Sequence, residues 1–226
     1  MYNDLTIITV NYQSSMKLNI TLNSVSDFIS KTNLKVEYIL IDGGSSDLNI
    51  KEFDHIINKF VTEPDDGIYD AMNKGQMLAT SKYLLFLNAG DKIFCDEKEH
   101  NLSVGIIECR LKGKHQSFWG RHICMGTPYC HQQVIFPNKK DNLYDLNYKI
   151  SADMKYMIDL NCHKKLKHIS GLWVEYDLDG ISQENYIQRD REIFQILFEN
   201  RYILYGIIFY GKSKILHFIR RIMKYA

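Results

Sequence analysis

The stretch EPDDGIYDAMNKGQMLATSKYLLFLNAGD, residues Glu63–Asp91, decides the fold. Pro64–Gly67 forms a turn, and the helix predicted over Gly67–Thr80 has apolar residues at helical spacing. Tyr83–Leu87 is an apolar run of strand length, and Asn88–Asp91 follows where that strand ends. An acidic residue just past the carboxyl end of a buried strand lies where α/β sheets bind ligands and metals.

Strand and helix patterns also precede this stretch. The predicted elements are, in order, a strand at Leu5–Val10, a helix at Met16–Ile29, a strand at Val36–Ile41 and a brief strand at Phe60–Val61. Gly43–Asp47 is a turn cluster whose last residues suit the cap of a following helix. The alternation β-α-β-α-β-α-β predicts an α/β fold with a mostly parallel sheet, covered by helices and joined by right-handed connections.

The pattern is looser after Asp91. Residues 92–130 are predicted to mix strands and loops. Three clearer elements follow: a helix at Ser151–Leu160, a strand or strand pair at Lys167–Tyr176 and a helix at Asn185–Phe198. Residues 201–226 are apolar and then basic.

Composition narrows the class of protein. With 45% hydrophobic and 24% charged residues among 226, the chain is long enough for one large domain with its own core. A net charge of +1 gives no overall field that would favour nucleic acid. Five cysteines at irregular spacing indicate reduced thiols and a cytoplasmic protein, and a zinc site at Cys124, Cys130 and His131 is not favoured. We find neither a signal peptide nor an apolar run long enough to span a bilayer.

Taken together, the motifs resemble the family 2 inverting glycosyltransferases of the GT-A fold, most closely the small bacterial enzymes of colanic-acid and O-antigen assembly. The matching segments are TIITVNYQ, IDGGSSD, EPDDGIYDAMNKG, FLNAGD, CHQQVIFP, YDLNYKISADMKYMI and GLWVEYDLDGIS. They imply a GT-A domain over residues 1–182, with a nucleotide-sugar half at 1–95 and an acceptor half at 96–182. Residues 183–226 would form a helical, basic-amphipathic extension.

The resemblance assigns donor-binding roles to polar residues near the strand ends. Asp42 would hydrogen-bond the nucleotide base or ribose, as a carboxylate can, unless it serves only the turn. The other residues assigned to the donor are Thr9, Asn11, Asp66, Asp70, Asn73, Asn88 and His131. Helix capping and a solvated helix face are the alternatives for Asp66, Asp70 and Asn73. The implied donor is a nucleotide-diphosphate sugar, with UDP favoured over GDP.

Asn88–Asp91 occupies the place of the family's Asp-X-Asp motif. A divalent cation, Mn²⁺ or Mg²⁺, can neutralise a diphosphate leaving group, and both ions prefer oxygen ligands. Asp91 would be the metal ligand. Asn88 replaces the first acid of the motif, which weakens the prediction of tight metal binding; Asp91 as a turn aspartate is the alternative.

Asp153 in KISAD matches the catalytic base of the family. Inversion requires a base that removes the acceptor hydroxyl proton as the hydroxyl attacks the anomeric carbon. The alternative is an aspartate that caps the following helix. Trp173, Tyr148 and Tyr176 are aromatic residues that suit either sugar stacking or the core.

The C-terminal segment combines apolar and basic residues. Its cations are Lys212, Lys214, Arg220, Arg221 and Lys224. An amphipathic basic helix suits the surface of an anionic membrane, where a polyprenyl-linked saccharide acceptor would lie. This predicts a peripheral protein on the inner face of the bacterial plasma membrane, with an ordinary packed helix or an oligomer contact as alternatives.

Two other functions stay open. The weakened Asp-X-Asp motif also suits a GT-A-like binding subunit that acts with a partner transferase. A nucleotidyltransferase is disfavoured, because Leu5–Ser15 contains no glycine for a phosphate-binding loop.

Overall fold

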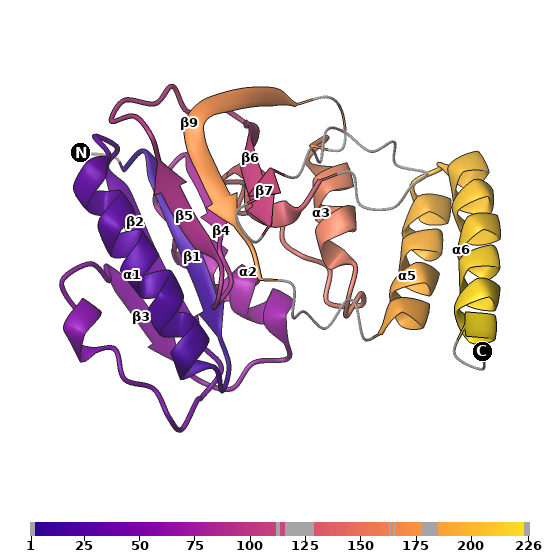
Figure 1. Ribbon diagram of the computed structural model, residues 1–226, viewed down its shortest axis with the longest axis horizontal. Coiled ribbons are helices and arrows are strands. Elements are labelled where there is room, and N and C mark those ends of the chain that lie inside the picture. Colours follow the sequence, from indigo (N-terminus) through magenta and orange to yellow (C-terminus); the bar gives the residue numbers. More distant parts are fainter. Residues whose placement is uncertain are drawn as a thin grey trace.

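The structure is a computed structural model, which describes residues 3–111, 114–115, 129–162, 164, 166–177 and 185–223. A mixed sheet forms its centre (Figure 1). Four neighbouring strands run parallel, in the order β3 (Lys59–Thr62), β2 (Val36–Asp42), β1 (Leu5–Asn11) and β4 (Tyr83–Phe86). Residues on both faces of β1 are fully buried, as expected for a parallel strand covered on both sides.

Helices cover the two faces of these parallel strands. Along β1, Ile7 packs in one apolar cluster with α1 (Ser15–Lys31), whereas Ile8 packs in another with α2 (Ile68–Leu78), because successive side chains in a strand point to opposite faces. The four predicted strands of this half and the helices predicted at Met16–Ile29 and Gly67–Thr80 are confirmed, with boundaries shifted by a few residues.

One predicted helix is wrong. The segment after Gly43–Asp47 contains only a short 3₁₀ turn, η1 (Lys51–Phe53), before β3 begins. The polar cluster was interpreted as a helix cap, but Asp42 uses its serine and backbone N–H groups to close a turn instead.

Beyond β4 the sheet continues mainly with antiparallel pairs. The further strands are β8 (Val134–Pro137), β6 (Gly105–Leu111), β9 (Lys167–Glu175), β5 (Lys92–Cys95) and β7 (Lys114–His115), which pairs with β6. Only β6 and β9 run parallel here. Cys124 lies outside the described residues.

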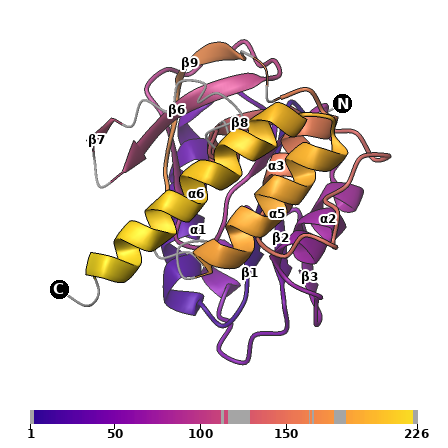
Figure 2. The same ribbon diagram turned by 90° about the vertical axis from the view of Figure 1, so that its right-hand side faces the viewer.

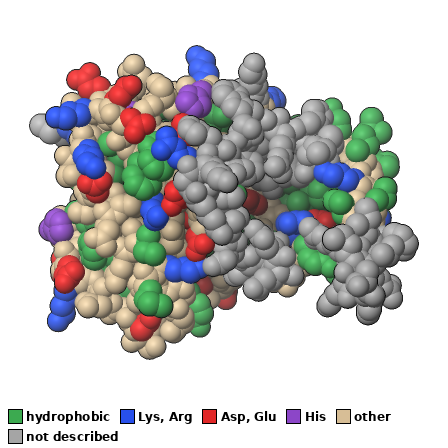
Figure 3. Space-filling model, viewed as in Figure 1, with side chains coloured by type: hydrophobic (Ala, Val, Ile, Leu, Met, Phe, Trp, Pro, Cys, Tyr) green, Lys and Arg blue, Asp and Glu red, His purple; other side chains and the backbone are tan. Residues whose placement is uncertain are grey.

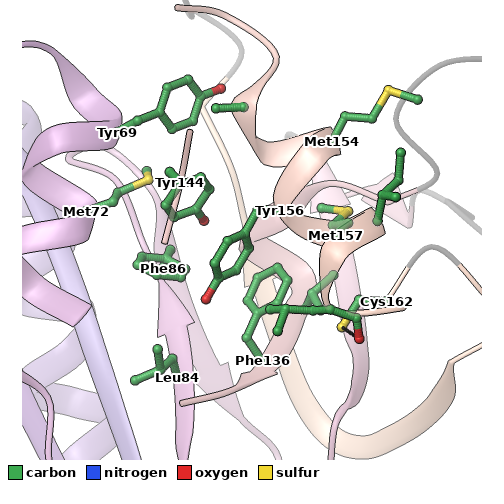
Figure 4. Close-up of a cluster of buried hydrophobic side chains, with 14 of the residues drawn as sticks. Tyr69, Met72, Leu84, Phe86, Phe136, Tyr144, Met154, Tyr156, Met157 and Cys162 are labelled. Atoms are coloured by element: carbon green, nitrogen blue, oxygen red, sulfur yellow. Dashed lines mark hydrogen bonds between the residues drawn. The ribbon is translucent and has the colours of Figure 1, made fainter. Parts of the chain in front are cut away.

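Aromatic residues fill the space between the sheet and α3 (Ala152–Asp159) (Figure 4). The rings of Tyr144 and Tyr156 stack with centroids 4.2 Å apart, and Phe86 of β4 meets Tyr144 edge-on. Tyr69 at the start of α2 stacks on Tyr144 from the other side, with centroids 5.2 Å apart. This cluster fixes α2 and α3 on the same side of the sheet.

The chain ends in two helices that lie side by side, α5 (Tyr186–Glu199) and α6 (Ile203–Met223) (Figures 1 and 2). Ile193 and Ile196 of α5 and Phe209 of α6 belong to the same buried cluster as α3. The division of the chain at residue 182 stays a prediction. Among the described residues, no helix combines the length and apolar character needed to cross a membrane.

Candidate functional site

Polar residues lie at the carboxyl ends of three adjacent parallel strands. Asn11 ends β1, Asp42 ends β2 and Thr62 ends β3, and the strand register places Asn11 and Thr62 on either side of Asp42. The edge formed by the carboxyl ends of these parallel strands is therefore polar, as predicted.

Asp42 is fully buried and is hydrogen-bonded entirely within the protein. Its Oδ1 accepts hydrogen bonds from Asn11 Nδ2 at 2.8 Å and Ser45 Oγ at 2.6 Å. Its Oδ2 accepts from Ser45 N at 2.8 Å, Thr62 Oγ1 at 3.0 Å and Gly44 N at 3.1 Å. Burial pushes the pKa of Asp42 upward, but the bonds from Ser45, Asn11 and Thr62 outweigh it and lower the pKa.

The predicted direct contact between Asp42 and the nucleotide has no support in this geometry, since about four lone-pair sites on a carboxylate already meet five donors. Asp42 instead stabilises the Gly43–Ser45 turn. Asn11 takes part in the same network, and Thr9 is fully buried. Asn11 Oδ1 and Thr9 Oγ1 have no hydrogen-bond partner among the described residues, and the donor contacts of both residues stay predictions.

Tyr12 and Asp65 lie above this turn and were not among the predicted site residues. A Cβ added to Gly43 would come within 2.7 Å of Asp65 Oδ2 and 3.0 Å of Tyr12 Cδ2, so both side chains lie close against this glycine and would have to shift to admit a larger residue. Tyr12 is 65% exposed although it directly follows a buried strand. An aromatic residue one position past a strand end is the sequence signal that identifies it.

The start of α2 exposes Asp66. Its backbone N–H donates to Asp70 Oδ2 at 3.1 Å, and Asp70 lies 3.4 Å from Lys74 Nζ. Gly67 has φ 111°, a left-handed conformation that glycine adopts readily. Asp66 and Asp70 are thus accessible at the strand ends, and their donor contacts stay predictions.

Asn73 lies on the packed side of α2, which corrects its placement on the polar face. Its Nδ2 donates to Tyr144 O at 2.9 Å, and its Oδ1 accepts from Tyr144 N at 2.7 Å. The side chain is buried, and both of its polar atoms bind the backbone of Tyr144; its donor contact stays a prediction.

Asn88–Asp91 forms a tight turn after β4, closed by a hydrogen bond of 3.0 Å from Asp91 N to Asn88 O. Gly90 has φ 103°, as a type II turn requires at its third residue. Asp91 is 2% exposed and accepts from three N–H groups: Asn88 N at 3.0 Å, Asp177 N at 2.9 Å and Gln132 Nε2 at 3.2 Å. Burial raises the pKa of Asp91 to about 6 despite these donors and the nearby His131.

The described residues do not fit a protein-built metal site. Asp91 is predicted as the ligand, but its oxygens accept from N–H groups, and no group of three or more metal-ligating side chains exists in the described part of the chain. The Asp177 carboxylate also lies beside Gly90, and its Oδ2 is 2.6 Å from Lys17 Nζ. The role of Asp91 as a metal ligand together with diphosphate oxygens stays a prediction.

His131 and Asp153 meet beside this turn. His131 lies in η3 (His131–Gln133), and its Nδ1 is 3.7 Å from Asp153 Oδ2 at the first turn of α3. The Tyr69 hydroxyl also lies nearby and donates to Ile150 O at 2.7 Å, and burial and the Asp153 carboxylate raise the pKa of this hydroxyl. The predicted base and the predicted donor-binding histidine are thus brought together from different parts of the chain.

Two buried polar atoms at this meeting point have no partner among the described residues, His131 Nε2 and Asn88 Oδ1. His131 is only 9% exposed. An unpaired buried polar atom costs about 1–3 kcal/mol, so two of them together call for a ligand, ion or water.

The aromatic residues considered for sugar stacking are already covered. Phe94 stacks on Trp173 with centroids 3.8 Å apart, and the Arg110 guanidinium lies 3.8 Å from the centroid of the same ring. Tyr148 is buried and donates to Glu199, and Tyr176 packs against the α1 side of the core. All three are structural in this geometry.

Comparisons with known proteins point to one family. The sequence model described as Glycosyl transferase family 2 matches residues 6–94. An uncharacterized glycosyltransferase of Mycobacterium tuberculosis (strain ATCC 25618 / H37Rv) is 33% identical over 202 residues, covering 77% of this chain and 75% of the relative. A PGL/p-HBAD biosynthesis glycosyltransferase of Mycobacterium bovis (strain BCG / Pasteur 1173P2) is 40% identical over 149 residues. That alignment covers 54% of this chain, which spans only 57% of the relative's length.

Solved structures show the same fold. Staphylococcus aureus TarS 1-349 in complex with UDP-GlcNAc matches with a TM-score of 0.61 at 16% identity, covering 86% of this chain and 66% of that one. The mannosyltransferase PcManGT from Pyrobaculum calidifontis, in complex with GDP-Man and Mn²⁺, also matches at 0.61, with 12% identity and coverage of 93% and 70%. The predicted GT-A fold is confirmed, and the relative matched over three quarters of its length shows that this chain belongs to glycosyl transferase family 2.

Proposed function

We propose that the protein transfers a sugar from a nucleotide-diphosphate donor to a hydroxyl group of a saccharide acceptor, with inversion at the anomeric carbon. Family membership and the polar strand ends support this proposal. Structural neighbours bound to UDP, UDP-GlcNAc and GDP-Man support a nucleotide sugar as the donor, and we favour UDP over GDP.

The observation that carries the proposal is the position of Asp153. Its carboxylate lies in the first turn of α3, where the helix dipole favours a negative charge, and its side chain is 19% exposed. As base, Asp153 would take the acceptor hydroxyl proton while the new C–O bond forms. The bond from the anomeric carbon to the diphosphate breaks in the same step, and the nucleoside diphosphate leaves.

In this proposal the donor is bound by residues beside this carboxylate, at the Gly43 turn and at the start of α2. His131 Nε2 and Asn88 Oδ1 are the buried atoms that would hydrogen-bond the diphosphate or the sugar. Asp66 and Asp70 are placed to contact the sugar or ribose, and Tyr12 offers its exposed ring to the base. One neighbour's complex contains Mn²⁺, and Asp91 is the residue proposed to bind a divalent cation here, but no proposed step depends on a metal.

We propose a bacterial surface-polysaccharide precursor, carried on a polyprenyl lipid, as the acceptor. A second candidate function is a GT-A-like binding subunit. The observation that favours it is the replacement of the first acid of the Asp-X-Asp motif by Asn88 together with the commitment of Asp91 to N–H groups.

The test compares Asp153→Asn with Asp159→Asn, a control at the other end of α3 whose carboxylate meets only Lys155 among the bonds described. Calorimetric titration with UDP, GDP and UDP-GlcNAc measures binding, and nucleotide release from UDP-GlcNAc or GDP-Man measures turnover. We expect Asp153→Asn to lower turnover about 10²–10⁴-fold with nucleotide affinity unchanged, and Asp159→Asn to behave as wild type.

Binding without turnover in the wild-type protein would favour the subunit. Equal turnover in both variants would remove Asp153 from its role. If no nucleotide binds, the donor-site proposal fails as a whole.

A further inference from the structure

One face of α6 is apolar and exposed. Leu204, Ile207, Ile208 and Ile215 follow helical spacing, so their side chains share one side of the helix. They are 67%, 59%, 48% and 62% exposed. Gly211 lies at the same side, and a Cβ added there would meet nothing within 4 Å.

The opposite face of α6 packs against α5. Phe209 and Ser213 are buried, and Ser213 Oγ donates to Asp190 Oδ2 of α5 at 2.7 Å. Gly206 lies against Leu197 and Phe194 of α5. The exposed apolar side chains therefore point away from the protein, and no rotation of α6 would bury them without breaking this packing.

Basic residues accompany the exposed apolar face of α6. In sequence, α6 carries Lys212, Lys214, Arg220 and Arg221 and contains no Asp or Glu. Figure 3 shows apolar side chains with lysine or arginine among them at the end of the molecule where Figure 1 places α5 and α6. A soluble monomeric protein seldom exposes so many large apolar side chains together, so this face indicates an interaction site. The positive charges beside it favour a partner with an anionic surface.

We propose that α6 lies on an anionic lipid surface, with Leu204, Ile207, Ile208 and Ile215 inserted at the level of the headgroups and acyl chains. Its cations would meet the lipid phosphates. The helix lies along the surface, because none of the described helices is able to span a bilayer. This surface is separate from the candidate active site, so the proposal goes beyond glycosyl transfer and does not depend on it.

The experiment is flotation of the full chain with two kinds of vesicle, phosphatidylcholine alone and phosphatidylcholine mixed with phosphatidylglycerol. The test variant is Ile207→Glu with Ile215→Glu. The control variant adds the same charge at exposed apolar residues elsewhere, Ile20→Glu on α1 and Met77→Glu on α2. Circular dichroism and the unfolding temperature establish that both variants are folded.

We expect wild type and control to float with the anionic vesicles, less so as salt is raised, and the α6 variant to bind at least about tenfold more weakly. Absence of binding by the folded wild type, or equal binding by the α6 variant, overturns the proposal. Light scattering addresses a second copy as the occupant: a dimer abolished by the α6 substitutions, with no flotation, also overturns it. Nucleotide titration of the same samples reports on the active site separately.

Discussion

At the scale of single residues, the buried Asp91 couples stability to pH. Its pKa of about 6 in the folded protein exceeds the ordinary value of 3.8, so the folded state binds the proton more tightly. Asp91 therefore favours folding at low pH, and this contribution is lost as pH rises from about 4 to about 6. The full effect is about 3 kcal/mol in the free energy of unfolding.

We predict that Asp91→Asn flattens this dependence. Urea unfolding at a series of pH values between the two pKa values would show a smaller slope than wild type, whatever the absolute loss of stability. Asp42 and Glu37 have lowered pKa values, so their stabilisation is present at neutral pH and is lost only as pH falls through the acidic range. Asp159→Asn serves as the surface control, and a wild-type slope in Asp91→Asn would contradict the assignment.

The sequence predicted the polar strand ends but not how their atoms are used. Alternating apolar runs locate Asn11 and Asp42 at one edge, because parallel strands end together. They carry no information on which donors reach Asp42. Ser45 and Thr62 saturate its carboxylate, and Asp177, 86 residues after Asp91, reaches that residue through the path of β9. Such contacts depend on tertiary packing, which one sequence does not reveal.

At the scale of elements, α2 packs on β1 through a glycine. A Cβ added to Gly75 would clash with Ile8 Cγ2 and lie 3.3 Å from Ile41 Cγ1. Both isoleucines belong to the buried core, so neither has space to move. Close contact at Gly75 sets the distance between the helix and the sheet.

We predict opposite signs for two glycine-to-alanine changes in helices. Gly75→Ala should lower the free energy of unfolding by about 1–3 kcal/mol through overpacking. Gly211→Ala lies in α6 with open space around it and should raise stability by about 0.5–1 kcal/mol through helix propensity. Denaturant unfolding measures both. A neutral or stabilising Gly75→Ala would show that the helix is free to shift outward.

Hydrophobic periodicity predicted the elements whose own sequence shows a clear helix or strand pattern. The strands of the parallel half and the helices α1, α2, α3 and α5 follow clear apolar spacing. The helix expected after Gly43–Asp47 is absent, because serine and glycine suit a cap and a turn equally, and the buried Asp42 selected the turn. The strands within residues 92–130 could not be located from the sequence, because the strands with which they pair, β8 and β9, lie far along the chain.

At the scale of the whole molecule, α5 holds the segment that precedes Asp153. Glu192 is buried, and its carboxylate accepts from the backbone N–H groups of Lys149 at 3.1 Å, Ile150 at 2.9 Å and Ser151 at 2.9 Å. The C-terminal helices thus support the proposed base, although they lie outside the nucleotide-binding half.

We predict that Glu192→Ala lowers stability by about 2–4 kcal/mol, because it leaves buried N–H groups unpaired. Turnover should fall more than nucleotide affinity, since the displaced segment carries Asp153 and not the strand ends. Gln195→Ala is the control, as its side chain contacts only Glu199 among the bonds described on the same helix. Equal losses in affinity and turnover would contradict this specific coupling.

The contact of Glu192 also determines which substitutions this part of the chain tolerates. The three donors from this segment are all main-chain groups, and the fourth donor to the carboxylate, Gln188 Nε2 at 2.9 Å, lies on α5 itself, so positions 149–151 are free to change their side chains as far as this contact is concerned. Proline is the exception, because it lacks the N–H group. A variant of this chain with redesigned C-terminal helices would therefore need an acid at the position of Glu192, whereas other side chains at 149–151 would leave this contact intact.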